Sequence, residues 1–161
     1  MEIYLLRHGT AENAHPGLKD SERALTEEGR EKLRRVLRRA RAAGVQPELI
    51  LSSPYRRALE TAAAAAEVFH YQDKVVQTAA LTPEAPPRGV WDEIRNNRNA
   101  ASVLLAGHEP LMSSLLAFLL NCPALLVDVK KSALARVDCE HFGPEPRATL
   151  KWMLTPRIAG E

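Results

Sequence analysis

Two histidines and two arginines follow short apolar runs at three separate places in the sequence. Arg7 and His8 follow one run, Arg57 lies a few residues after another, and His108 follows a third. The planar donors of arginine match the oxygens of a phosphoryl group, and each charge-assisted hydrogen bond contributes about 1.5 to 3 kcal/mol. An imidazole with a free nitrogen lone pair can attack phosphorus. If these places meet in the fold, they form a phosphate-binding pocket with a histidine nucleophile.

Other common ways of handling phosphate or activating a nucleophile are absent from the sequence. There is no GxxxxGK[ST], GxGxxG or GxSxG motif, and neither Cys122 nor Cys139 is followed six residues later by arginine. His108 and Glu109 continue into Pro110 without the second histidine of HExxH. The two cysteines lack CxxC spacing and are predicted to be buried free thiols. We therefore expect a histidine nucleophile, no metal and no cofactor.

The charges around these histidines favour such a role. Arg7 and Arg57 would lower the pKa of His8 and keep its ring neutral near pH 7, as a nucleophile requires. His108 would feel the same field, although a bound dianion would favour its protonated form. Activity is therefore expected to fall on both sides of a pH optimum. His15, His70 and His141 have no cationic neighbours of this kind and are predicted to be surface or loop residues.

The site must be positioned by alternating strands and helices. The predicted strands are Ile3–Leu6, Glu48–Leu51, Val75–Val76 and Ser102–Ala106. Predicted helices start at an N-cap Thr26 and at Ser53-Pro54, end near Gly44 and Phe69, and return over Val90–Arg98 and Pro110–Leu120. Leu81–Arg88 is a proline-rich loop, and the alternating segments SALARVD and ATLKWML predict a terminal hairpin or two strands of the same sheet.

This order predicts an α/β fold, a single-domain three-layer sandwich over residues 1–161 with a mostly parallel central sheet and helices on both faces. The functional crevice of such folds lies beyond the carboxyl ends of the strands. His8 and His108 both follow strand ends, so they are expected at one rim.

Length and composition agree with an ordinary globular protein. The 161 residues are 45% hydrophobic and 26% charged, with a net charge of +2, which is too mild to indicate nucleic acid. The uncharged segment Pro110–Val127 offers about ten apolar-periodic positions where roughly twenty are needed to cross a bilayer, so no membrane span is expected. The segment MEIYLLRHG has no basic leader, which predicts a cytoplasmic protein without a signal peptide.

Four blocks in order closely resemble the histidine phosphatase superfamily, also called the phosphoglycerate mutase-like fold. They are Arg7-His8-Gly9, the stretch Asp20–Gly29, the block SPYRRALET over residues 53–61, and Gly107-His108 before Pro110. The short chain and the stretch DSERALTEEG look most like the bacterial phosphohistidine phosphatases of the SixA type. The resemblance implies that His8 is the nucleophile and forms a phosphohistidine intermediate that water hydrolyses.

The same resemblance implies roles for the remaining site residues. Arg7, Arg57 and His108 would hold the three non-bridging oxygens and offset charge in the transition state. The family pattern places arginine directly before alanine, which selects Arg57 and leaves Arg56 as a surface or substrate-facing cation. Asn13 stands where some relatives carry a phosphate-contacting asparagine, with a turn-forming role as the alternative.

The general acid is less well defined by the sequence. Glu84, in the loop after Leu81, is the candidate to protonate a leaving oxygen, and a solvated loop carboxylate is the alternative. A phosphohistidine substrate would tolerate a poorly placed acid, because a protonated imidazole leaves readily from a P–N bond. A phosphate monoester would need the acid more.

The substrate expected from this reading is phosphohistidine on a protein, such as a histidine-containing phosphotransfer domain, because the short chain leaves no room for a large cap over the pocket. The alternatives are a small-molecule phosphomonoesterase acting on a small phosphate ester, and a phosphate-binding interaction module without turnover. The basic helix Arg30–Arg41 is either a solvated face or a docking surface for an acidic partner.

Overall fold

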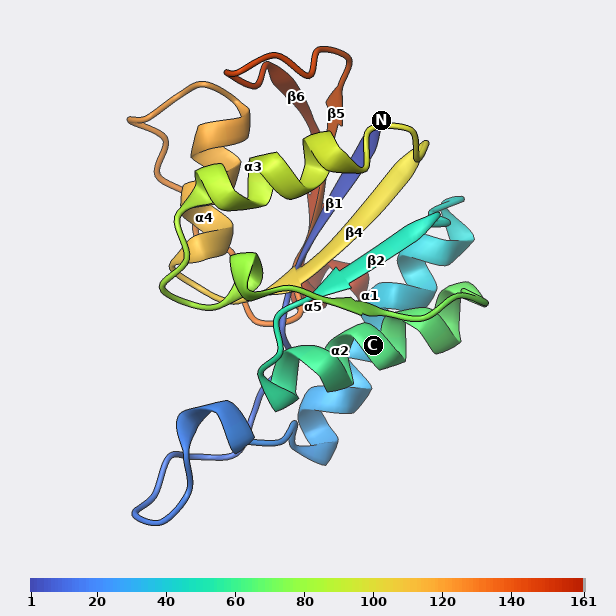
Figure 1. The fold of residues 1–161 in the computed structure, drawn as a ribbon. Helices are drawn as coiled ribbons and strands as arrows, with labels where there is room; N and C mark the ends of the chain where they lie inside the picture. Colours follow the sequence, from blue (N-terminus) through green and yellow to red (C-terminus); the bar gives the residue numbers. More distant parts are fainter. Residues whose placement is uncertain (161) are drawn as a thin grey trace.

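A six-stranded sheet runs through the middle of the computed structural model, which describes residues 1–160 (Figure 1). Its order is β3-β2-β4-β1-β5-β6. The neighbours among β3, β2, β4 and β1 pair in parallel, whereas β5 pairs antiparallel with β1 and with β6. The strands span β1 Glu2–Arg7, β2 Leu49–Ser52, β3 Val76–Gln77, β4 Ser102–Gly107, β5 Leu134–Cys139 and β6 Ala148–Leu154. The predicted mostly parallel sheet and the terminal strand pair are confirmed.

Helices cover both faces of this sheet. In Figure 1, α1 and α2 lie together on one side and α3 and α4 on the other. The helices span α1 Glu27–Ala42, α2 Arg56–Phe69, α3 Pro87–Asn96, α4 Leu111–Leu119 and α5 Pro156–Ala159, with short 3-10 turns η1 Asp20–Glu22 and η2 Ala79–Leu81. Three layers result, as the alternation of strands and helices predicts.

Successive residues of the central strands face opposite layers, as the pleat of a strand requires. Ile3 and Leu5 of β1 pack in the core beneath α3 and α4, whereas Tyr4 and Leu6 pack in the core beneath α1 and α2. All four side chains are essentially fully buried. β1 therefore has no solvent-facing side, and its carboxyl end, where His8 follows, is anchored by both cores.

Helix α1 begins where the sequence predicts. The Thr26 side chain accepts a hydrogen bond from the Gly29 N–H, and Leu33, Val36 and Leu37 are buried. Gly44 follows the last turn with φ +89°, a left-handed conformation that glycine adopts without strain.

Three expectations were wrong in detail. Helix α2 begins at Arg56 rather than at Ser53-Pro54, and its N-cap Tyr55 makes no side-chain cap. Helix α3 begins at Pro87, inside the segment expected to be a loop. Cys122 is exposed and only Cys139 is buried, because Cys122 falls beyond the end of α4 and not on its packed face.

No helix among residues 1–160 is long and apolar enough to cross a bilayer.

Candidate active site

His8 stands directly after β1, and its backbone is held on both sides. Its N–H donates to the Gly107 carbonyl at 3.0 Å, and its own carbonyl accepts from the Ser132 N–H at 3.1 Å. Ring atom Nδ1 lies 2.7 Å from the Gly9 carbonyl oxygen. Because a carbonyl oxygen can only accept, Nδ1 carries the ring proton, and Nε2 of the neutral ring keeps its lone pair. The geometry offers Nε2 as the nucleophilic atom.

The Arg57 side chain faces this nitrogen from the first turn of α2. Its Nε donates to Nε2 of His8 at 3.3 Å, and the residue is only 4% exposed. Its Nη1 donates to the Asp20 carbonyl oxygen at 2.6 Å and its Nη2 to the Asp20 carboxylate at 3.0 Å. Asp20, in η1, therefore occupies the guanidinium donors that a phosphoryl oxygen would need.

His108 follows β4 and lies beside His8, with 5.0 Å between the ring centroids. Its Nε2 is 2.8 Å from Oγ of Ser53, which accepts a hydrogen bond from the Tyr55 N–H at 3.3 Å. With that oxygen already accepting, the Ser53 hydroxyl proton is free to point at Nε2. Nδ1 of His108 is buried and has no hydrogen-bond partner within residues 1–160. A phosphoryl oxygen would satisfy this nitrogen, which is costly to leave unpaired.

Arg7 ends β1 and supplies a second guanidinium to this rim. Its Nη1 donates to the Val129 carbonyl at 2.7 Å. Its Nε is buried and lacks a partner in the part of the chain that the structure describes. Burial lowers the pKa of Arg7 from its ordinary value, while the charges of Glu109 and Asp128 act in the opposite direction. The side chain thus retains donors for an anion.

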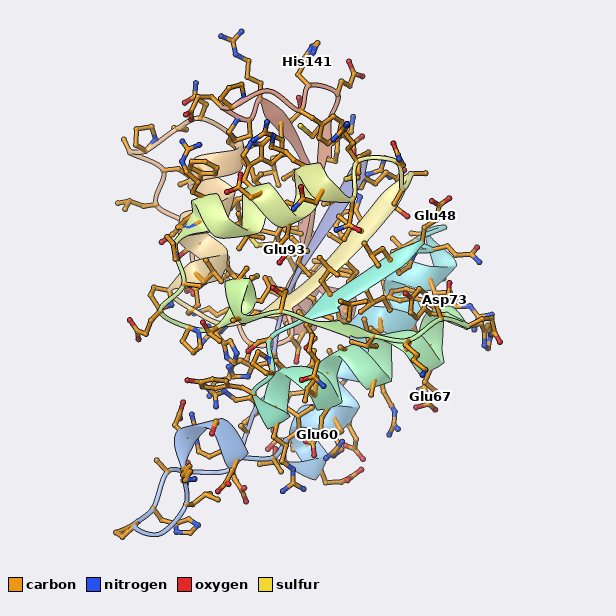
Figure 2. All side chains as sticks on the ribbon, in the orientation of Figure 1. Glu48, Glu60, Glu67, Asp73, Glu93 and His141 are labelled. Carbon is orange, nitrogen blue, oxygen red and sulfur yellow. The ribbon has the colours of Figure 1, made fainter. Side chains whose placement is uncertain are left out.

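Helix α2 is fixed against the end of β1 by one hydroxyl group. Oγ1 of Thr61 donates to the Arg57 carbonyl at 2.7 Å and accepts from the Gly9 N–H at 3.2 Å. The preceding residue, Glu60 (labelled in Figure 2), accepts from the Leu25 N–H at 2.7 Å and pairs with Arg30 of α1. Both contacts hold the start of α2, and therefore Arg57, in register with His8.

Both site histidines are neutral near pH 7. Burial lowers the pKa of His8 to about 4, helped by the charges of Arg57 and Arg7 and opposed by its hydrogen bond to Gly9. Burial likewise lowers the pKa of His108 to about 3, with further lowering by His8 and Arg57. The arginine effect was expected from the sequence. The larger contribution of burial was not, because it depends on the packing of several elements.

The structure brings together His8, Arg57, His108 and Arg7. It places Glu84 in an exposed turn after η2, and Asn13 on the exposed segment that precedes η1. Arg56 is exposed and pairs with Glu60, as expected for a surface cation.

Other observations concern residues outside the proposed pocket. His15, His70 and His141 are exposed, as expected, and His141 lies at the other end of the sheet from residues 10–24 (Figures 1 and 2). Within the described residues no group of three or more His, Cys, Asp and Glu side chains is arranged to hold a metal ion.

Three contributors were missed by sequence reasoning. Asp20 holds Arg57, Ser53 contacts His108, and Thr61 joins α2 to Gly9. Thr61 had a signal, since it stands four residues after Arg57 and can accept or donate one helical turn away. The contacts of Asp20 and Ser53 bridge distant segments and had no local signal.

The chain is similar in sequence and in fold to known proteins. Residues 3–82 match the family model of the histidine phosphatase superfamily (branch 1). The chain is 29% identical over 163 residues to the phosphohistidine phosphatase SixA of Escherichia coli (strain K12), covering 97% of this chain and 94% of that protein. An uncharacterised protein of Picosynechococcus is 35% identical over 118 residues, covering 68% of this chain and 67% of that protein.

A solved structure extends the comparison to three dimensions. The structure of the protein histidine phosphatase SixA complexed with tungstate superposes with a TM-score of 0.87 at 28% identity, covering 98% of each chain. On its sequence motifs, its fold and these matches, the chain belongs to the histidine phosphatase superfamily.

Proposed function

We propose that this chain is a phosphohistidine phosphatase that removes phosphoryl groups from phosphorylated histidine on a protein, without a metal ion. The observation that carries the proposal is the state of His8. Its Nδ1 donates to the Gly9 carbonyl, so Nε2 of the neutral ring is unprotonated, and the Nε2 lone pair accepts a hydrogen bond from Arg57 Nε. A non-catalytic phosphate-binding module would not require such a nitrogen.

The chemistry proceeds in two displacements. The Nε2 lone pair of His8 forms a bond to phosphorus as the P–N bond of the substrate breaks, and the protonated imidazole of the substrate leaves as neutral histidine. Arg57, Arg7 and His108 hold the non-bridging oxygens and offset their charge. A water molecule then attacks phosphorus, the bond to Nε2 breaks, and inorganic phosphate leaves. Arg57 can serve this step once its Nη atoms exchange Asp20 for phosphoryl oxygens.

Because of the nature of the leaving group, the enzyme does not need a well-positioned general acid to protonate it. Glu84 is exposed, and a protonated substrate imidazole leaves without a proton from the enzyme. We therefore expect Glu84→Gln to retain most of the activity on phosphohistidine. The similarity to SixA over nearly the full chain supports the choice of phosphohistidine over a small phosphate ester.

The experiment compares turnover of a histidine-phosphorylated phosphotransfer domain with that of a sugar phosphate, both in the presence of a chelator. The wild-type protein should prefer the phosphorylated domain and lose no activity to the chelator. His8→Ala should abolish turnover, whereas the exposed control His15→Ala should not. Preference for the sugar phosphate would instead make the chain a small-molecule phosphomonoesterase. Binding of phosphate without turnover of either substrate would make it an interaction module.

A further inference from the structure

A basic groove of about 900 Å³ adjoins the proposed phosphate site. Four separate parts of the chain line it: the end of β1 with the residues that follow, one side of α1, the segment 128–131, and α5 with its flanking residues. The cationic side chains in its lining are Arg7, Lys32, Arg35, Lys130, Lys131 and Arg157. Among the lining residues in the described range, Asp128 is the acidic one, so positive charge dominates there.

Several of these cations have no acidic partner among residues 1–160. Lys130 pairs with Asp128, and Lys32 pairs with Glu28 of its own helix. Arg35, Lys131 and Arg157 make no ion pair with any residue in the range 1–160. Nε of Arg35 is in addition buried without a hydrogen-bond partner in that range. The groove therefore gathers positive charge that residues 1–160 do not neutralise.

The other basic side chains of α1 are used differently. Arg30 pairs with Glu60 and Arg34 with Glu67, and both of these acidic residues lie on α2 (Figure 2). Those arginines join two helices within the fold. The basic helix seen in the sequence thus has one side that serves packing and another, with Lys32 and Arg35, that lines the groove.

The groove is continuous with the catalytic rim. Arg7 belongs to both, and Lys131 precedes Ser132, whose N–H donates to the His8 carbonyl at 3.1 Å. The positive charge of Lys131 contributes to the low pKa of the His8 ring. A substrate whose phosphoryl group lies next to His8 would therefore extend over the cations of the groove.

We propose that this groove binds acidic side chains of the phosphorylated protein, next to its phosphohistidine. The inference rests on the proposed function and adds the chemistry that selects the partner. The volume greatly exceeds that of one phosphate group, and the cations are spread over four segments rather than converging on one point. This distribution fits several carboxylates on a protein surface better than the second phosphate of a small molecule. Such charges steer association and set partner choice.

The test reverses two exposed charges that lie outside the catalytic set, in the double variant Lys130→Glu/Arg157→Glu. For a phosphorylated acidic phosphotransfer domain, we expect kcat/KM to fall about tenfold or more, mainly through KM. For a small aryl phosphate it should stay within about twofold. Raising the salt concentration should slow the wild type on the protein substrate more than it slows the variant. The matched control is Arg38→Glu/Arg39→Glu, which changes exposed charges of α1 outside the groove lining.

The outcomes separate the two proposals. If the wild type turns over the phosphorylated domain and the groove variant matches it, the docking role is refuted and the proposed function stands. If the groove variant instead loses a small bisphosphate substrate as strongly as the protein, the groove binds a second phosphate and the inference is wrong. If the wild type turns over only the aryl phosphate, the proposed function fails and the docking role fails with it. A thermal melt equal to that of the wild type excludes misfolding as the cause of a loss.

Discussion

The position of one proton on His8 decides which ring nitrogen can act as a nucleophile. The Gly9 carbonyl accepts from Nδ1, and Arg57, which can only donate, faces Nε2. Both neighbours favour the same tautomer, and burial keeps the ring neutral. The sequence indicates a nucleophilic histidine, and the structure identifies the nitrogen.

In the proposed function, Asp20 and the phosphoryl group would compete for Arg57. Because its carboxylate occupies Nη2 of Arg57, we expect Asp20→Asn to bind inorganic phosphate more tightly, by about fivefold or about 1 kcal/mol. The measurement is the inhibition constant of phosphate against an aryl phosphate. The control is Asp73→Asn, an exposed carboxylate beyond the end of α2 (Figure 2). Weaker phosphate binding by the Asp20 variant would show that Asp20 positions Arg57 for the anion rather than competing with it.

At the scale of elements, the site depends on how closely α1 approaches the end of β1. A Cβ on Gly29 would come within 2.2 Å of the Thr10 carbonyl oxygen, and one on Gly9 within 3.1 Å of the Gly29 carbonyl oxygen. Two glycines thus allow the first turn of α1 to lie against the backbone that follows His8. Close packing there leaves little room for the backbone of residues 9 and 10 to move.

Gly29→Ala should therefore destabilise the protein by about 1 to 3 kcal/mol, because the helix must shift away from the Thr10 backbone. The matched control is Gly89→Ala, also at the third residue of a helix, where the new Cβ would have Ala80 at 3.9 Å as its neighbour. That control should be neutral or stabilising by up to about 1 kcal/mol, because alanine favours the helix. Urea unfolding measures both. Equal stabilities would contradict the proposed role of the close approach.

Elements with a local signal were predictable, and contacts between distant segments were not. The capping side chain of Thr26 predicts the start of α1. The buried apolar runs of β1 and β4 place His8 and His108 at strand ends. Ser53 resembles a helix cap, but its hydroxyl lies against His108, so α2 begins three residues later. The Asp20 contact with Arg57 joins residues 37 positions apart and depends on the folded segment before α1.

For the whole molecule, the two buried histidines couple stability to pH. The folded pKa of His8, about 4, lies below its ordinary value of 6.5, so between these values the unfolded chain binds a proton that the folded chain does not. Stability from this residue is therefore fully present above pH 6.5 and is lost as the pH falls toward 4. His108, with a folded pKa of about 3, acts in the same direction.

We expect the free energy of unfolding to fall between pH 7 and pH 4, with about 3 kcal/mol of the loss due to His8, at about 1.4 kcal/mol per pKa unit. Urea unfolding at several pH values measures the slope. His8→Asn should flatten it, whereas the exposed control His15→Asn should leave it unchanged. A slope that is the same in both variants would mean that His8 is not held neutral by the fold.

The central claim is that His8 carries the phosphoryl group during turnover. The most direct measurement is to quench a reaction with labelled substrate within the first turnover and locate the label by peptide mapping. The label should lie on Nε2 of His8, resist alkali and be lost in acid, and it should be absent from His8→Ala but present in His15→Ala. Label on any other side chain, or full turnover by His8→Ala, would contradict the account.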